Sequence, residues 1–158
     1  IKLGANRLGR RLVVAKRFDF KNETIKQRGD LFRIRTVGTT AMITYKKFTG
    51  KNKKYKIMDE FETPVADFKI MEKILTLLGF ICTVHHEKWR TSFLLNGAHY
   101  EIDEYPRIPP YLEIEGPQNK IRAGLKLLGI PFASTTNLTA NKVLKKYGVN
   151  ARIVRFKK

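Results

Sequence analysis

Apolar and polar side chains alternate with a period of two over most of the chain, a pattern typical of half-buried β-strands. Turn residues separate the alternating segments. Asn96-Gly97, between two of them, is a strong hairpin signal because both residue types accept the positive φ angles of a tight turn. We therefore predict strands over residues 11–20, 31–37, 41–47, 54–62, 81–95, 98–105 and 111–115.

Three other segments have the spacing of amphipathic helices. The first can begin after Asp67, whose side chain can cap free N–H groups, and it would end at Gly79. Its apolar positions are expected to share one face: Phe68, Met71, Ile74, Leu75 and Leu78. A second helix is predicted over residues 118–128, and a third after Thr139 that ends at Gly148. Long antiparallel strands with a few covering helices predict an α+β domain.

The polar face of the predicted strands is almost entirely ionic. Its cations are Arg33, Arg35, Lys46, Lys56, Lys88 and Arg90, and its acids are Glu60, Glu62, Glu101, Asp103, Glu113 and Glu115. The ordinary explanation is an antiparallel sheet with one solvated face. Alternatively, the sheet closes with this face inward and forms a tunnel with a cationic wall and a carboxylate cluster. Such a wall would hold phosphate oxygens, and the carboxylates would suit Mg²⁺ or Mn²⁺.

The net charge narrows the choice of partners. Among 158 residues, 32 Lys and Arg stand against 14 Asp and Glu, which gives a formal charge of +18. This excess favours an anionic partner, which could be nucleic acid, polyphosphate or an anionic membrane surface, over a merely Lys-rich surface. The longest apolar run, residues 77–82, is far too short to cross a membrane, so we predict no membrane insertion.

Cysteine and histidine usage excludes some kinds of site. Cys82 is the only cysteine, so the chain has no internal disulfide and no metal site built from several cysteines. We expect an intracellular, cytoplasmic protein, because a chain without a disulfide is typical of a reducing compartment. His85 and His86 are adjacent in a predicted strand, point to opposite faces, and so cannot easily share a metal ion.

Six short motifs occur in an order that is specific to one family. They are Leu31-Phe32-Arg33-Ile34-Arg35, Thr44-Tyr45-Lys46, Glu60-x-Glu62, Lys88-x-Arg90, Ile102-Asp103-Glu104 and Tyr111-Leu112-Glu113-Ile114-Glu115-Gly116. Over roughly residues 3–150 the chain resembles the CYTH superfamily, the triphosphate tunnel metalloenzymes. The segment Ile108-Pro109-Pro110, just before the last motif, is similar to the class IV adenylyl cyclase-like branch.

The resemblance implies an eight-stranded antiparallel tunnel that binds a nucleotide or other triphosphate with Mg²⁺ or Mn²⁺. Carried over by position, the phosphate-binding residues would be Arg33, Arg35, Lys46, Lys56, Lys88 and Arg90. The metal ligands would be Glu113, Glu115 and Asp103, with Glu60 and Glu62 as further tunnel acids. No side chain is assigned as a catalytic nucleophile.

Two departures from the family pattern leave two functions open. The family's initial Glu-x-Glu-x-Lys strand is not in the sequence, and Met58 stands where an arginine is expected. We expect residues 1–158 to form a single CYTH-like domain whose first strand lies upstream of Ile1. The first function is metal-dependent hydrolysis or cyclisation of a triphosphate compound. The alternative is a catalytically inactive basic module that binds RNA, for example within a ribonucleoprotein such as a ribosome.

Overall fold

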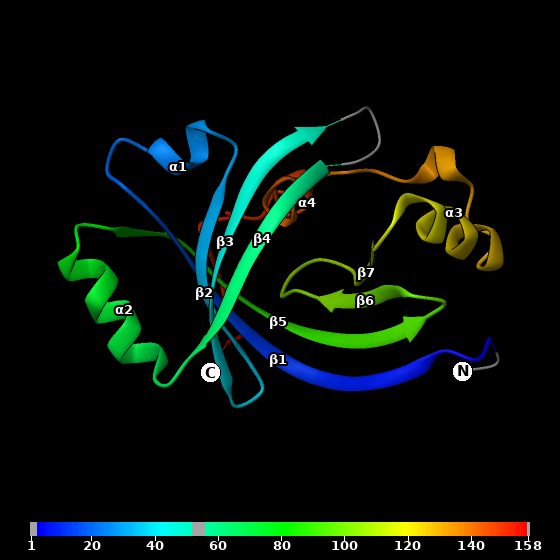
Figure 1. The fold of residues 1–158 in the computed structure, drawn as a ribbon, viewed down its shortest axis with the longest axis horizontal. Helices are drawn as coiled ribbons and strands as arrows, with labels where there is room; N and C mark the ends of the chain where they lie inside the picture. The colour runs from blue at the N-terminus through cyan, green and yellow to red at the C-terminus, as the bar shows by residue number, and fades with distance from the viewer. Residues whose placement is uncertain (1–2, 52–55, 158) are drawn as a thin grey trace.

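In the part of the chain that the structure describes, eight strands pair into one sheet that carries most of the fold (Figure 1). The computed structural model describes residues 3–51 and 56–157. For Lys51 and Lys56 it describes the backbone alone. The strands are β1 (Asn6–Asp19), β2 (Leu31–Val37), β3 (Thr40–Lys51), β4 (Lys56–Val65), β5 (Ile81–Leu95), β6 (Ala98–Glu104), β7 (Tyr111–Glu115) and β8 (Ile153–Val154). The helices are α1 (Thr24–Gln27), α2 (Phe68–Leu77), α3 (Gln118–Leu127), α4 (Ala140–Lys146) and the 3₁₀ helix η1 (Phe132–Ser134).

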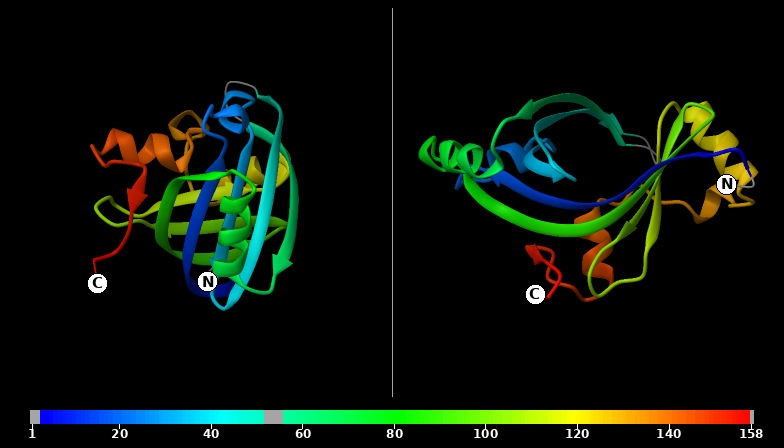
Figure 2. Two further views of the ribbon diagram at one scale, coloured as in Figure 1. Left: turned by 90° about the vertical axis from the view of Figure 1, so that its left-hand side faces the viewer. Right: turned by 90° about the horizontal axis from the view of Figure 1, so that it is seen from below.

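Two local meanders, β2-β3-β4 and β5-β6-β7, are joined through β1 in the strand order β4-β3-β2-β1-β5-β6-β7. β1 pairs antiparallel with both β2 and β5. β5 has 15 residues, so the edge that does not face β1 is long enough to pair with two other strands. β6 pairs with its C-terminal half, and β8 lies parallel to it beside His85 and His86. Figure 2 shows β1 and β5 running side by side as long, curved ribbons.

The sheet curls into a half-barrel with a concave and a convex face (Figure 2). The predicted α+β class and the curled, mainly antiparallel sheet are confirmed. The bounds of β2, β5 and β7 agree with the prediction, whereas β1 begins earlier, at Asn6, and β3 extends to Lys51. The predicted fourth strand starts at residue 54, and residues 54 and 55 lie outside the described ranges. The short elements α1, η1 and β8 were not predicted.

The predicted Asn96-Gly97 hairpin connects β5 to β6. Asn96 has a φ of 51° and Gly97 a φ of 75°, so both residues adopt the left-handed conformation of a two-residue hairpin turn. The pairing of Leu95 with Ala98 closes directly behind the turn. Local turn chemistry therefore sets the register of these two strands.

Helix α2 covers the convex face of the sheet. It begins as predicted at Asp67, whose carboxylate accepts a hydrogen bond from the backbone N–H of Ile70 at 2.8 Å. Leu75 packs with Phe18 and Ile34 in a buried apolar cluster. The predicted apolar face is wrong in part, since Ile74 is 43% exposed and Leu78 is 65% exposed. The helix contacts the sheet along a narrow stripe only, and these two side chains lie outside it.

A second apolar cluster lies at the C-terminal end of the chain. Helix α4 and strand β8 contribute Leu144 and Val154, which pack with Tyr105 beyond the end of β6. The buried imidazole of His86 contacts the segment between α4 and β8, since its Nε2 lies 2.8 Å from the carbonyl oxygen of Ala151. Among the described helices, none combines the length and the apolar character needed to traverse a lipid bilayer.

Helix α3 packs closely against β6 at Gly124. A Cβ atom at this position would overlap the hydroxyl oxygen of Tyr100 and would lie 2.8 Å from its Cζ atom. Tyr100 is buried in a third apolar cluster with Leu95 and Ala98, so its ring has little room to move. Glycine at this position lets the helix approach the sheet.

We predict that Gly124→Ala destabilises the protein by about 1–3 kcal/mol, because the added methyl group forces Tyr100 from its place. At an unhindered helix position the same change would stabilise by about 0.5–1 kcal/mol. Urea denaturation measures the difference. In a Tyr100→Phe background, where the hydroxyl is absent, the cost should be smaller. An increase in stability from Gly124→Ala alone would contradict the close packing.

Candidate anion-binding site

Three adjacent strands at the centre of the sheet place cationic side chains on the concave face. In the β1–β2 pairing, Arg17 stands opposite Arg33 and Ala15 stands opposite Arg35. In the β1–β5 pairing, Val13 stands opposite Lys88. Alternation along each strand directs these side chains to one side of the sheet, so the register brings the four cations together.

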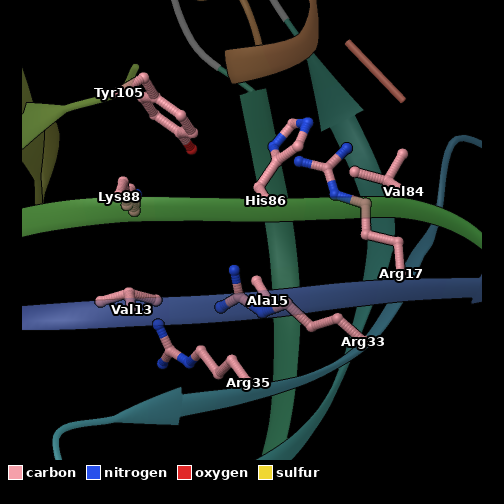
Figure 3. A pocket seen from close by; sticks show the side chains of 9 residues that line it. All are labelled: Val13, Ala15, Arg17, Arg33, Arg35, Val84, His86, Lys88 and Tyr105. Atoms are coloured by element: carbon pink, nitrogen blue, oxygen red, sulfur yellow. The ribbon is translucent and has the colours of Figure 1, made fainter. Parts of the chain in front are cut away.

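The cations surround a small cavity of about 40 Å³ (Figure 3). Its lining is Val13, Ala15, Arg17, Arg33, Arg35, Val84, His86, Lys88 and Tyr105. The volume suits about three water molecules, or a single phosphoryl group. The Nε atoms of Arg33 and Arg35 are buried and have no hydrogen-bond partner in the structure. Buried donors are nearly always paired, so these two atoms indicate a missing acceptor.

Positive charge exceeds negative charge in this cavity. Burial, and then the neighbouring charge of Arg35, lowers the pKa of the Arg33 guanidinium to about 10. Burial also lowers the pKa of Arg17, and burial together with the charge of Arg90 lowers that of Lys88. Arg33 remains protonated near neutral pH, and the cavity disfavours the charged form of all three side chains. A bound anion would relieve this strain.

The predicted tunnel acids Glu60 and Glu62 lie on β4 and face the cations of β2 and β3. Glu62 accepts hydrogen bonds from Arg35 at 2.9 Å and from the Thr44 hydroxyl at 2.5 Å. Burial opposes its charge, but these two partners outweigh burial and hold the pKa of Glu62 below its usual value. Glu60 pairs with Lys46 at 2.7 Å and lies 3.7 Å from a terminal nitrogen of Arg33. Lys46, Arg33 and Arg35 are therefore all paired with acids of β4 through their terminal nitrogens, and the Nε atoms of the two arginines have no partner among the described residues.

A second ionic network is built around Asp103 on β6, a side chain with no solvent exposure. It accepts a hydrogen bond from Lys88 at 2.5 Å and one from Arg90 Nε at 2.6 Å. Arg90 also donates to Glu113 of β7 at 2.6 Å. Burial alone would raise the pKa of Asp103, but the hydrogen bond from Arg90 and the charge of Lys88 lower it. Burial raises the pKa of Glu113. The charges of Lys88 and Arg90 act in the opposite direction and that of Asp103 in the same direction, and the net result is a raised pKa.

These contacts bear on the predicted metal ligands Asp103, Glu113 and Glu115. Two of the three carboxylates are engaged by protein cations, and the Glu115 residue is exposed. Within residues 3–51 and 56–157, no three His, Cys, Asp or Glu side chains come together in a way that could hold a metal ion. As arranged, the carboxylates fit Lys88 and Arg90 and do not fit a metal. The assignment of metal ligands stays a prediction.

Of the six predicted phosphate-binding residues, the structure brings Arg33, Arg35 and Lys88 to the cavity. Lys46 and Arg90 lie on the concave face in ion pairs, and the side chain of Lys56 lies outside the description. Sequence reasoning missed the following cavity residues: Arg17, His86 and Tyr105. Strand parity was the available signal for Arg17, but its face of β1 also carries apolar Val13 and Ala15.

His86 is a neutral, structural member of the cavity. A carbonyl oxygen can only accept, so the contact with Ala151 places the proton on Nε2 and leaves Nδ1 without one. Burial lowers the pKa of His86 to about 4, although the hydrogen bond to Ala151 acts in the opposite direction. His86 thus ties the C-terminal segment to β5 without adding a charge near pH 7.

Comparisons with known proteins identify relatives of the fold. The family model described as the CYTH domain matches residues 18–145. The structure of PH1012 from Pyrococcus horikoshii OT3 aligns with a TM-score of 0.64 at 21% identity, over 99% of this chain and 85% of the other. A candidate adenylate cyclase from Vibrio parahaemolyticus aligns with a TM-score of 0.64 at 10% identity, over 99% of this chain and 83% of the other.

A plant protein shares the same fold. HpAC1 from Hippeastrum, a candidate adenylyl cyclase described as having a dominant triphosphatase activity, aligns with a TM-score of 0.60 at 14% identity. The alignment covers 91% of this chain and 85% of the other. A search of curated protein sequences finds no match.

We predict that the free energy of unfolding falls as the pH drops from about 6.5 to about 4, because the unfolded chain binds a proton at His86 before the folded chain does. The stabilisation is fully present above pH 6.5, and the shift corresponds to about 3 kcal/mol at His86. Chemical denaturation across this range measures the slope. His86→Gln should flatten it, since glutamine can still donate to Ala151 but does not titrate.

His85→Gln is the matched control for this measurement. His85 is less buried, and burial and the charge of Lys16 also lower its pKa. Its replacement should therefore remove a smaller part of the slope. Equal flattening by both variants would argue against a special role for the His86 contact.

We predict that Asp103→Asn costs about 3–5 kcal/mol of stability, because it removes the counterion that Lys88 and Arg90 share and leaves only Arg90 with another acid partner, Glu113. The adjacent control is Glu104→Gln, which removes the partner of Arg10 in a half-exposed ion pair. That change should cost less than about 1 kcal/mol. Urea denaturation of both variants tests the contrast, and similar losses would show that the Asp103 network does not organise the sheet.

Proposed function

Because the chain belongs to the CYTH domain family, we propose that its concave face binds the phosphate groups of a triphosphate compound, with one phosphoryl group in the cavity between β1, β2 and β5. The observation that carries the proposal is the pair of buried Nε donors of Arg33 and Arg35 without partners. Phosphate oxygens are acceptors that would satisfy both. Arg17 and Lys88 add two further cations to the same space.

The arrangement suits an oligophosphate better than a single carboxylate ligand. Arginine presents several donors in a planar fork, which matches phosphate oxygens, whereas lysine acts as a compact point charge. The cations extend from the cavity along the concave face, where Lys46 lies on β3 and Arg90 on β5. Neighbouring phosphoryl groups of one ligand would compete with Glu60, Glu62 and Asp103 for these cations.

Hydrolysis of the bound triphosphate compound is a further step beyond phosphate binding. The triphosphatase activity described for HpAC1, at 14% identity, supports hydrolysis of the bound compound as a reaction to test. A Mg²⁺ or Mn²⁺ cofactor is inferred from the family resemblance alone, and phosphate binding by the four cations does not require it. The residues of this chain would bind and orient the phosphates and stabilise charge on their oxygens.

We predict that the protein binds inorganic tripolyphosphate and ATP at low salt without added metal. Arg33→Gln and Arg17→Gln should each weaken binding by roughly 10- to 100-fold, the loss expected for a buried charge-assisted hydrogen bond. Isothermal titration calorimetry measures the affinities, and phosphate release with and without Mg²⁺ or Mn²⁺ measures turnover.

Lys47→Gln is the control for this experiment. Lys47 follows Lys46 directly, is exposed, and points to the opposite face of β3, so its replacement removes the same charge from the wrong side of the sheet. Its affinity should stay within about two-fold of the original protein, as expected for a distant, screened surface charge. Equal losses in Lys47→Gln and Arg33→Gln would refute a site on the concave face.

A further inference from the structure

A large groove lies at the end of the sheet, where β1 ends and β2 and β5 begin. Helix α1 forms one wall, and α4 with the segment that follows it forms another (both helices are seen in Figure 1). Its volume is about 1810 Å³. Pockets for small ligands usually span about 300–1,000 Å³, so the groove suits an extended occupant. We call it the basic groove because of its cations, which are Lys16, Arg17, Lys21, Lys26, Arg28, Lys142, Lys145 and Arg152.

The carboxylates that line the basic groove are already engaged within the protein. Asp19 accepts hydrogen bonds from three backbone N–H groups, and Asp30 accepts from the Tyr45 hydroxyl and a backbone N–H. The other two form ion pairs, Glu23 with Lys26 and Glu72 with Lys16.

Six cations of the groove form no ion pair with a carboxylate in the part of the chain that the structure describes: Arg17, Lys21, Arg28, Lys142, Lys145 and Arg152. All except Arg17 are exposed residues. They come from α1 and its flanks on one wall and from α4 and the C-terminal segment on the other. This unbalanced charge around an extended hollow favours a polyanion.

The rest of the lining indicates which polyanion fits. Apolar and aromatic side chains also line the groove, among them Phe32, Phe48 and Ile81. Asn141 also lines the groove, and its buried Oδ1 atom has no hydrogen-bond partner among residues 3–51 and 56–157. An amide oxygen accepts hydrogen bonds and repels phosphate, so it needs a donor such as a base N–H or a ribose hydroxyl. Polyphosphate has neither such donors nor an apolar surface, whereas a single nucleic acid strand has both.

We propose that the basic groove binds single-stranded RNA, with its phosphates on the lysines and arginines of the two walls and its bases or riboses against apolar side chains of the lining. Arg17 and Val84 line both the groove and the concave cavity, so the two spaces adjoin. The groove nevertheless has its own cations, and RNA binding there does not depend on triphosphate binding.

The test uses the complete chain and a 3′-labelled oligouridylate of about 12 nucleotides with a 5′-hydroxyl end, so that no terminal phosphate can enter the cavity. Fluorescence anisotropy gives the affinity across a salt series. The double variant Lys142→Gln/Lys145→Gln should weaken binding at least several-fold at low salt. It should also flatten the slope of log affinity against log salt by up to about 1.4, since each lost phosphate contact contributes roughly 0.7.

The matched control is Lys120→Gln/Lys126→Gln, which removes two exposed charges from α3 outside both spaces. It should leave both affinity and slope nearly unchanged. Arg33→Gln should also leave oligouridylate binding intact while it weakens tripolyphosphate binding, which separates failure of this site from failure of the concave one. Equal weakening by the two double variants would overturn the proposal. So would groove-dependent binding of long-chain polyphosphate or an acidic peptide without binding of the oligouridylate.

Discussion

The carboxylate of Asp103 allows two cations to stand next to each other on the concave face of β5. Lys88 and Arg90 lie two residues apart in the strand, so both side chains project to the same side, where like charges repel. Asp103 lies across from Arg90 in β6 and contacts both cations, and Glu113 in β7 contacts Arg90 from the next strand. The ionic contacts therefore follow the β5-β6-β7 meander and depend on its register. A shift of β6 by one residue would move Asp103 to the convex face, away from both cations.

Charge compensation is uneven across the sheet, and this unevenness defines the candidate site. At one end β4 supplies Glu60 and Glu62 to the cations of β2 and β3, and at the other end β6 and β7 supply acids to β5. The central strand β1 brings Arg17 beside Arg33 with no acid in register between them. Arg33, Arg35 and Lys88 each pair with an acid of a neighbouring strand, whereas Arg17 forms no ion pair within the described residues, so the charge at the centre of the half-barrel that lacks compensation is that of Arg17. The same arginine borders the basic groove, which carries this charge to the end of the sheet.

Alternation of side chains is a local property, so the sequence was sufficient to predict β2, β5, β7 and the face that carries Arg33, Arg35 and Lys88. Partners across strands depend on register between distant segments, which explains why the ion pairs of Arg90 and Lys46 could not be predicted. Arg17 was missed because its nearest neighbours on the same face of β1, Val13 and Ala15, are apolar and interrupt the polar alternation. β8 was missed because two residues that pair with a distant strand leave no periodic signal. The exposure of Ile74 and Leu78 depends on how α2 lies against the sheet, which helical periodicity does not determine.

The position of β1 between the two meanders has a consequence for how the chain reaches its folded state. Each meander pairs strands that are neighbours in sequence, and its turns close short loops. The β1–β5 pairing instead joins Asp19 to Ile81 and Asn6 to Leu94, with the whole first meander and α2 in the intervening loop. Closing such a loop is entropically costly before the new contacts form, and non-local pairing of this kind slows folding. The two halves can therefore acquire local structure first, while the central cavity forms only at the slow docking step, since β5 contributes Val84, His86 and Lys88 to its lining.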